Sequence, residues 1–369
     1  MQASPAEIEE LRRSIREFAQ GSLPPRAARR VADEGDAFDQ SSWQVIAESM
    51  GLAAIGVPPE YGGAGYSFTE LGIVLEELGR ALTPVPFLSS AVISTAALLD
   101  CGDEQARQEL LPGIAAGTTI ATVVLGGLEE WPAPDRLAII ATADGGRYQL
   151  DGGADFVLDA GGAGVLLVVA ALEEGWGLFA AKPSTASVVC RRSALDLTRP
   201  VHSVSFTAAP ARLLGCGPAP WPGLSAVISK LSVALACEQV GGTAHCLDMT
   251  VAYAKIRHQF GRPIGSFQAI KHRCADLLVE LEAARSLAYH ARDLAATSSP
   301  GLSEAAAAAG SWCANAYVHT AQETIQLHGG IGFTWEHDAH LHLRRARAGQ
   351  LLFGTPRAHR RALADAMGI

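Results

Sequence analysis

The stretch Ile256–Gln268 reads IRHQFGRPIGSFQ and separates two long segments with apolar residues at helical spacing. A second stretch, Gln326–Gly332 (QLHGGIG), follows a third such segment. Arginine in the first stretch offers fixed donors that suit a pyrophosphate, and the paired glycines of the second let backbone amides approach an anion closely. Taken alone, each stretch is equally compatible with a simple helix corner or helix end.

Working outward, the apolar spacing predicts C-terminal helices over about 224–256, 266–297, 303–328, 337–352 and 356–367. Residues 118–215 instead contain short β-type runs, among them a hairpin around Asp144-Gly145-Gly146. The N-terminal residues are helical, with capping-box patterns at Ser4–Glu7 and Ser67–Glu70. The sequence therefore predicts an α+β fold. It comprises an N-terminal helical domain (1–117), a small middle β-barrel or β-sandwich domain (118–215) and a C-terminal four-helix bundle (216–369).

Composition excludes several classes of function. The chain has 369 residues and a net charge of −9, which argues against binding to nucleic acid or an anionic membrane. Seven scattered cysteines without a CxxC motif favour a reducing compartment, so we expect a cytoplasmic protein. The most apolar segment, 224–240, is interrupted by Lys230 and Glu238, which favours a buried bundle helix over a membrane span. The histidines show no metal-binding triad, so no metal site is expected.

Together, and placed after a β block, the two stretches resemble the acyl-CoA dehydrogenase family. Further similarity lies in GLAAIGVPPEYGGAG (51–65), EELGRALTPVPF (76–87), DLTRP (196–200) and HSVSF (202–206). The resemblance implies subunits that assemble as dimers of dimers and share FAD between neighbours. It also implies α,β-dehydrogenation of a CoA thioester, in which a carboxylate removes the α proton and the flavin accepts the β hydride. By match, the residues that would hold the ADP half of a flavin seated mainly in the adjoining chain are Arg257, Gln259, Phe260, Gln268, Gln326, Gly329 and Gly330.

Three positions depart from the family pattern. The usual catalytic glutamate is replaced by Phe353 in LLFGT, and the alternative base position falls at or near Leu231. The family's flavin-binding T-E-P-x-x-G-S-D is replaced by the segment 124–131 (VLGGLEEW). The threonine expected beside the flavin ring is Leu158, and a buried polar group left without its hydrogen bond costs about 1 kcal/mol or more.

Other charged residues were weighed as substitutes for the missing base. Glu238 lies two turns beyond Leu231, and a partnered structural carboxylate is the simpler interpretation of it. Glu336 precedes a predicted helix and is interpreted as a cap. The basic run that contains Arg344, Arg345 and Arg357 is interpreted as a solvated helix face, or else as contacts to a partner subunit or a CoA phosphate.

The motifs that serve a neighbour's flavin are kept, and those that serve the chain's own flavin and base are lost. The chain thus resembles the non-catalytic subunit of actinobacterial heterotetrameric acyl-CoA dehydrogenases of the steroid side-chain type, with no catalytic residue of its own. The implied partners are a homologous subunit with the catalytic glutamate, an acyl-CoA substrate, and an electron-transfer flavoprotein or similar acceptor. Two alternatives stay open: a self-sufficient homomeric dehydrogenase with a relocated base, with Glu238 as candidate, and a flavin-free CoA-thioester binding or scaffold protein.

Overall fold

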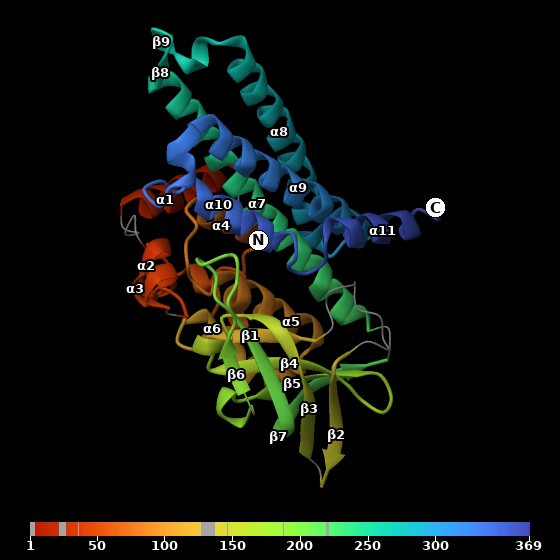
Figure 1. Ribbon diagram of the computed structural model, residues 1–369. Coiled ribbons are helices and arrows are strands. Elements are labelled where there is room, and N and C mark those ends of the chain that lie inside the picture. The colour runs from red at the N-terminus through yellow and green to blue at the C-terminus, as the bar shows by residue number, and fades with distance from the viewer. Residues whose placement is uncertain are drawn as a thin grey trace.

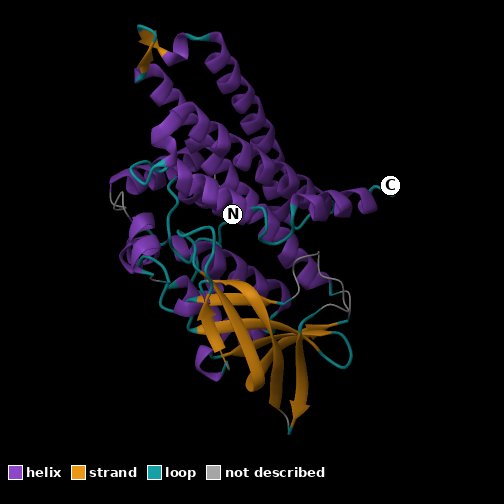
Figure 2. Cartoon of the chain, in the orientation of Figure 1, coloured by secondary structure: helices purple, strands orange, loops and turns teal. Residues whose placement is uncertain are grey.

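The computed structural model describes residues 4–21, 27–35, 37–126, 137–145, 147–186, 188–218 and 221–369. A helical N-terminal part and a helical C-terminal part flank a β region, as the sequence predicts (Figure 2). Both predicted capping boxes are present. The Ser4 and Glu7 side chains bond each other's backbone amides, and Ser67 and Glu70 form the reciprocal pair that opens a helix. The N-terminal helices are α1 (Pro5–Gly21), α2 (Ala27–Glu34), α3 (Gln40–Gln44), α4 (Phe68–Arg80), α5 (Thr95–Cys101) and α6 (Glu104–Ala115), and a π-helical segment, η4 (Phe87–Ser94), leads into α5.

The middle part is a seven-stranded sheet within the described residues, and its strand order closes it into a small barrel. The predicted hairpin is confirmed, because β2 and β3 pair antiparallel from Asp144–Arg147 outward; Gly146 of its turn lies outside the described residues. Apolar side chains of β3, β4 and β5 fill the interior, among them Leu150, Val168 and Phe179. The strands are β1 (Ala121–Leu125), β2 (Ile139–Asp144), β3 (Arg147–Leu158), β4 (Val165–Ala171), β5 (Trp176–Ala181), β6 (Val188–Arg191) and β7 (Val201–Gly217).

The C-terminal part is the predicted helical bundle. Its helices are α7 (Pro222–Ile256), α8 (Gln268–Thr297), α9 (Leu302–His328), α10 (Ala339–Gly349) and α11 (Pro356–Ala366). The predicted helix 337–352 is longer than α10 at both ends. At its C-terminal end the chain leaves the helix at Gly349 and turns through Phe353 and Gly354 with positive φ angles. At the α7–α8 corner a small hairpin of β8 (His258–Gln259) and β9 (Arg262–Pro263) projects beyond the other helices (Figure 1).

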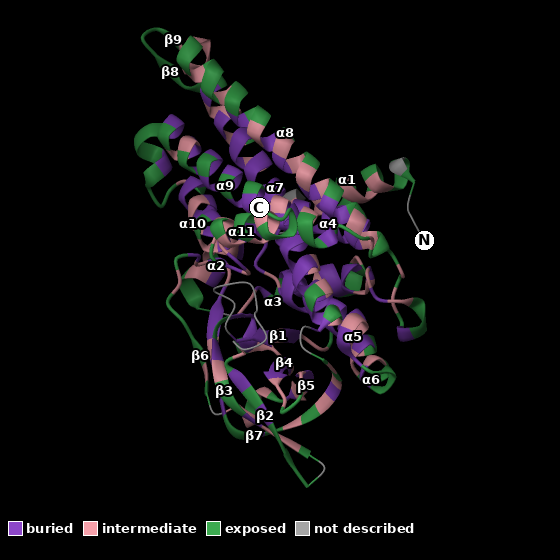
Figure 3. Ribbon diagram, turned by 90° about the vertical axis from the view of Figure 1, so that its right-hand side faces the viewer, coloured by how far each residue is buried: buried purple, intermediate pink, exposed green. Residues whose placement is uncertain are grey.

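Helix α7 is the central helix of this bundle. By length and composition alone it could cross a membrane, but 78% of its apolar window is buried inside the protein. It packs against α4, α8 and α9, and the ribbon coloured by burial shows it enclosed by its neighbours over most of its length (Figure 3). The burial supports the expectation of a core helix over 224–240.

Candidate functional site

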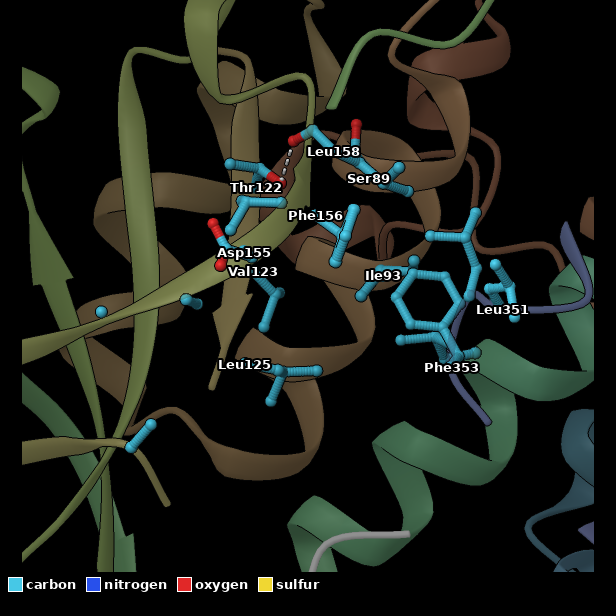
Figure 4. Close-up of a pocket in the computed structure, with 16 residues that line it drawn as sticks. Ser89, Ile93, Thr122, Val123, Leu125, Asp155, Phe156, Leu158, Leu351 and Phe353 are labelled. Carbon is cyan, nitrogen blue, oxygen red and sulfur yellow. Dashed lines mark hydrogen bonds between the residues drawn. The ribbon is translucent and has the colours of Figure 1, made fainter. Parts of the chain in front are cut away.

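A cavity of about 600 Å³ lies where the three parts of the chain meet (Figure 4). The N-terminal part contributes side chains of η4, the barrel contributes β1 and β3, and the bundle contributes α7 and the turn after α10. The described lining residues are mostly apolar and include Ile93, Val123, Leu125, Phe156, Leu158, Leu231, Leu351, Leu352 and Phe353.

Both positions that the resemblance assigns to a base line this one cavity. Phe353 reaches it from the turn before α11, and Leu231 reaches it from the third turn of α7. Neither side chain can accept a proton. Among the described lining residues the one carboxylate is Asp155, which is 53% exposed and forms an ion pair with Arg192 at 2.8 Å. The described wall of the cavity therefore offers no free base.

The hydroxyl groups at the cavity wall are already engaged. Ser89 Oγ donates to Asp159 Oδ2 at 2.5 Å, and Thr122 Oγ1 donates to the carbonyl oxygen of Leu158 at 2.7 Å. Figure 4 labels Ser89 and Thr122 at the cavity and shows the hydrogen bond from Thr122 to Leu158 as a dashed line. Asp159 is fully buried, and this burial raises the pKa of its carboxyl group to about 6. Sequence reasoning missed Ser89 and Asp159, because they lie 70 residues apart and share no local motif.

Three phenylalanines adopt the left-handed backbone region, which bulky side chains rarely occupy. Phe156 (φ 62°) and Phe353 (φ 60°) both line the cavity, and Phe260 (φ 52°) lies in the β8–β9 hairpin. Such conformations cost free energy and are concentrated at functional sites. The strained phenylalanines thus mark the same two regions that the sequence singled out.

Glu238 is a structural carboxylate, as its simpler interpretation predicted. It is buried, forms an ion pair with Arg199, and accepts a hydrogen bond from Arg345 Nη1 at 3.3 Å. Arg345 is also paired through Nε with Asp196 at 2.5 Å, and its Nη2 donates to Thr198 Oγ1 at 2.6 Å. Glu238 is not among the described lining residues of the cavity. The network ties the end of the barrel to α7 and α10 and leaves Glu238 committed to two arginines.

Two further expectations were wrong. Glu336 does not cap a helix: α10 begins after Asp338, its first amide (Ala339) donates to His337 Nδ1 at 3.2 Å, and Glu336 is exposed. Arg344 and Arg345 of the basic run do not lie on a solvated face, because Arg345 is buried and the Arg344 guanidinium lies 5.4 Å from the centre of the Trp335 ring. Contacts of the other arginines to a partner subunit or a CoA phosphate stay a prediction.

The predicted flavin-contact residues of the first stretch are exposed. Arg257, Gln259 and Phe260 lie at the projecting hairpin, and the Phe260 ring is 91% exposed. Within the part of the chain that the structure describes, the Arg257 guanidinium has no hydrogen-bond or ion-pair partner. Phe267 stiffens the hairpin, since the Arg262 guanidinium lies 4.1 Å from its ring centre and Phe260 packs edge-on against it.

The structure places the second stretch, Gln326–Gly332, at the same end of the bundle as the β8–β9 hairpin. The His328 ring, directly before Gly329, stacks on Tyr253 with ring centres 4.4 Å apart, and Tyr253 lies one turn before Arg257. Gln326, Gly329 and Gly330 are exposed, and a Cβ added to either glycine would meet nothing within 4 Å. Gly329 has φ 63° and ψ −142°, a conformation that is essentially restricted to glycine. Gln268 is the first residue of α8, beside the hairpin, so all seven predicted residues gather at this end.

This hairpin end and the cavity lie at opposite ends of α7. From Leu231 to Arg257 the chain advances 26 positions, and at about 1.5 Å per helical residue this corresponds to roughly 40 Å. A flavin held by the hairpin is therefore far from the cavity of its own chain (Figure 1).

Family models match most of the chain. The acyl-CoA dehydrogenase N-terminal domain matches residues 5–118, and the acyl-CoA dehydrogenase C-terminal domain matches residues 224–368. Acyl-CoA dehydrogenase IpdE2 of Mycolicibacterium smegmatis is 35% identical over 357 residues, which are 97% of this chain and 97% of that protein. Acyl-CoA dehydrogenase FadE34 of Mycobacterium tuberculosis is 36% identical over 95% of this chain and 46% of its own length.

Solved structures share the whole architecture. A variant of the steroid ACAD Tcur3481-Tcur3483 is 30% identical, with a TM-score of 0.87 over 98% of each chain. The ChsE4-ChsE5 complex of Mycobacterium tuberculosis is 25% identical, with a TM-score of 0.90 over 99% of this chain and 98% of that chain. Butyryl-CoA dehydrogenase of Megasphaera elsdenii, at 22% identity and a TM-score of 0.89, shows the same fold.

Members of this family bind FAD, and the two regions differ in how they fit that molecule. The hairpin end offers an exposed guanidinium, an exposed aromatic ring and glycine amides, which suit an anionic nucleotide half. The described side chains of the cavity wall do not fit a flavin ring, because the Ser89 and Thr122 hydroxyls already donate to internal partners and the Leu158 side chain has no donor. Of the substituted flavin-binding segment 124–131, residues 127–131 lie outside the described residues.

Proposed function

Because this chain belongs to the acyl-CoA dehydrogenase family, we propose that it is the non-catalytic subunit of a heteromeric dehydrogenase. A homologous partner subunit carries the catalytic glutamate and most of the flavin site, and this chain completes the ADP-binding half in trans. The observation that supports the proposal most strongly is the separation along α7. The nucleotide-binding features lie at one end, and a cavity without a base lies roughly 40 Å away at the other.

The role of this chain is to bind and orient the nucleotide half of the cofactor. When bound, FAD supplies the hydride-accepting ring of the family's reaction. The exposed Arg257 would hold a pyrophosphate group through charge-assisted hydrogen bonds, and the amides around Gly329 and Gly330 would contact the same anionic group. The exposed Phe260 would pack against the nucleotide from the hairpin. The proton acceptor belongs to the partner, since neither Phe353 nor Leu231 can act as one.

The relatives support a steroid-derived acyl-CoA as the substrate class. One similar structure is described as a steroid ACAD, and another is a complex of two different chains. We infer that the complex dehydrogenates the CoA thioester of a steroid side chain, and that an electron-transfer flavoprotein or similar acceptor reoxidises it in the cytoplasm. The alternative of a self-sufficient enzyme has no available base, because its candidate, Glu238, forms an ion pair with Arg199 and accepts a hydrogen bond from Arg345.

Flavin stoichiometry tests the assignment. The chain is expressed alone and together with a glutamate-bearing homologue from the same genome, and bound FAD is counted per polypeptide. We expect one FAD per two chains in the complex, and neither flavin nor dehydrogenation of an acyl-CoA in this chain alone. A yellow, active protein from this chain alone would support the self-sufficient enzyme, and a complex without flavin would support the scaffold.

A further inference from the structure

The two segments at the hairpin end come from different helices, and a pair of rings joins these helices where the segments begin. Arg257 directly follows α7, and Gly329 directly follows α9. Tyr253 lies one turn before the end of α7, and His328 is the last residue of α9. Their rings stack with centres 4.4 Å apart and planes 24° apart. The stack therefore links the hairpin to the glycine turn through two helix ends.

The His328 ring is held in one orientation. Its Nδ1 atom lies 2.7 Å from the carbonyl oxygen of Thr324, one turn earlier on α9, so this nitrogen carries the proton and donates it. The ring of His337 contacts the His328 ring at 4.5 Å between centres, and His337 Nδ1 in turn accepts the first amide of α10 at 3.2 Å. His328 is buried. An enclosed ring with a fixed hydrogen bond has little freedom to rotate.

The contacts on either side of the stack are also short and ordered. The hydroxyl groups of Thr250 and Thr324, both fully buried, form a hydrogen bond of 3.0 Å between α7 and α9. Beyond the stack, the Arg257 amide donates to the Tyr253 carbonyl at 2.9 Å, and the Ile264 amide donates to the Arg257 carbonyl at 2.8 Å. A shift of Tyr253 is therefore passed on to the backbone of Arg257.

We propose that His328 is a positioning residue for FAD: its ring stack holds the Arg257 hairpin and the Gly329–Gly330 turn in one fixed arrangement, so that both can contact one nucleotide. The inference rests on the proposed function, because it takes both segments to serve the same cofactor. His328 acts through Tyr253 and through the adjoining glycine, and not on the nucleotide. Without the stack the two segments sample other arrangements, and only the competent fraction of molecules binds.

The test is the dissociation constant of FAD, titrated into the deflavinated complex of this chain with its partner. His328→Ala removes the ring and should weaken FAD binding about threefold to tenfold. His328→Phe keeps an aromatic ring in the stack and should restore the affinity to within about twofold of wild type. Tyr253→Leu removes the ring from the α7 side and should weaken binding in the same way, which gives a second measurement if His328→Ala does not fold.

His342→Ala is the matched control for a merely structural role. His342 is as deeply buried as His328, and its ring stacks on His245, also of α7, with planes 24° apart and centres 4.9 Å apart. His245 precedes Arg257 by 12 positions, or roughly 18 Å along the helix. The control should lower the free energy of unfolding as His328→Ala does, yet leave FAD affinity within about twofold of wild type. Equal losses of affinity in the two variants would overturn the proposal.

A double variant shows whether His328 acts through Arg257. In an Arg257→Ala background, His328→Ala should weaken FAD binding by less than about twofold, because the contact that the stack positions is already absent. The same loss in both backgrounds, or unchanged affinity in both His328→Ala and Tyr253→Leu, would contradict the positioning role. Arg257→Ala alone tests the proposed function, so a failure of the positioning role and a failure of the subunit assignment give different results.

Discussion

The two ends of helix α7 present opposite chemistry to a flavin. At the hairpin end the side chains of Arg257 and Phe260 are exposed, and the glycines at the end of α9 lie beside them. At the other end, Leu231 and Phe353 line an apolar cavity whose hydroxyls are internally bonded. Features that could serve a site in another chain are retained, whereas features that would serve a site in this chain are replaced by apolar side chains. This contrast is what a division of labour between unlike subunits predicts.

The largest effect we expect concerns Glu238, which lies between the two ends. Glu238→Ala leaves Arg199 buried without its carboxylate partner and Arg345 with Asp196 alone, and breaking such a buried pair costs about 3–5 kcal/mol in the free energy of unfolding. Urea denaturation of the complex measures this loss. Glu109→Ala, which breaks an exposed pair with Arg212, should cost less than about 1 kcal/mol. If Glu238→Ala preserved stability but abolished an activity of this chain alone, Glu238 would be the base.

A second effect is acid sensitivity between the two ends of α7, at His245. Burial lowers the pKa of His245 from 6.5 to about 4, and its ring stacks on His342, whose pKa burial also lowers. His245 is therefore neutral in the folded chain while the unfolded chain takes up a proton as the pH falls below about 6.5. Stability is fully present above that pH and is lost between about 6.5 and 4, by roughly 3 kcal/mol for this group.

The measurement compares the free energy of unfolding of wild type and His245→Phe between pH 7.5 and 4.5. The wild-type protein should lose more stability over this window, because the variant no longer has this titrating group. Equal slopes for the two proteins would show that His245 is not held neutral. Arg80 and Asp248, which form an ion pair at 2.5 Å near His245, are unchanged in both proteins.

Arg257→Ala tests the hairpin end directly. Losing a charge-assisted hydrogen bond of about 1.5–3 kcal/mol should weaken FAD binding to the complex by about 10- to 150-fold. The dissociation constant is measured by titrating FAD into the deflavinated complex. Arg273→Ala is the control, because Arg273 lies on the same end of α8 but is already paired with Glu323 at 3.1 Å. Unchanged affinity after Arg257→Ala would contradict binding in trans.

Much of the fold was predictable because it depends on local periodicity. The bounds of α7, α8 and α9 lie within two residues of their predictions, since their apolar faces repeat at helical spacing. The end of α10 could not be predicted, because Leu351 and Leu352 continue the apolar pattern although the backbone has already left the helix. The ion pair between Glu238 and Arg199 could not be predicted from the spacing of residues, because it depends on how the barrel packs against the bundle.

The features of the candidate site were likewise predictable only in part. The substitutions at Phe353 and Leu231 are visible in the sequence, but only the three-dimensional structure shows that they face one cavity. Likewise, the stacking of Tyr253 on His328 joins segments 75 residues apart and could not be read from either motif. Contacts of this kind carry no periodic or short-range signal.

A smaller effect separates the two glycines of the hairpin end. Gly329→Ala forces a Cβ into a backbone region that favours glycine and should lower the free energy of unfolding by about 1 kcal/mol. Gly330→Ala should leave stability unchanged, because Gly330 has no positive φ and an added Cβ meets no neighbour. Thermal denaturation of both variants measures the difference. Equal stability of the two would show that the conformation of Gly329 carries no strain for alanine.

For the last variant, which changes the cavity, we expect no effect on the activity of this chain alone. Phe353→Glu restores a carboxylate at the family's base position, yet this chain alone should still show no turnover of an acyl-CoA with an electron acceptor. A glutamate among Leu231, Leu352 and Leu158 would be pushed toward its neutral form by desolvation, and the described hydroxyls of the wall would still be bonded to internal partners. Phe353→Gln, equal in size and uncharged, is the control and should behave identically. Robust oxidation by the glutamate variant alone would show that the cavity end keeps a working flavin site, and the contrast between the two ends of α7 would then reduce to a single missing side chain.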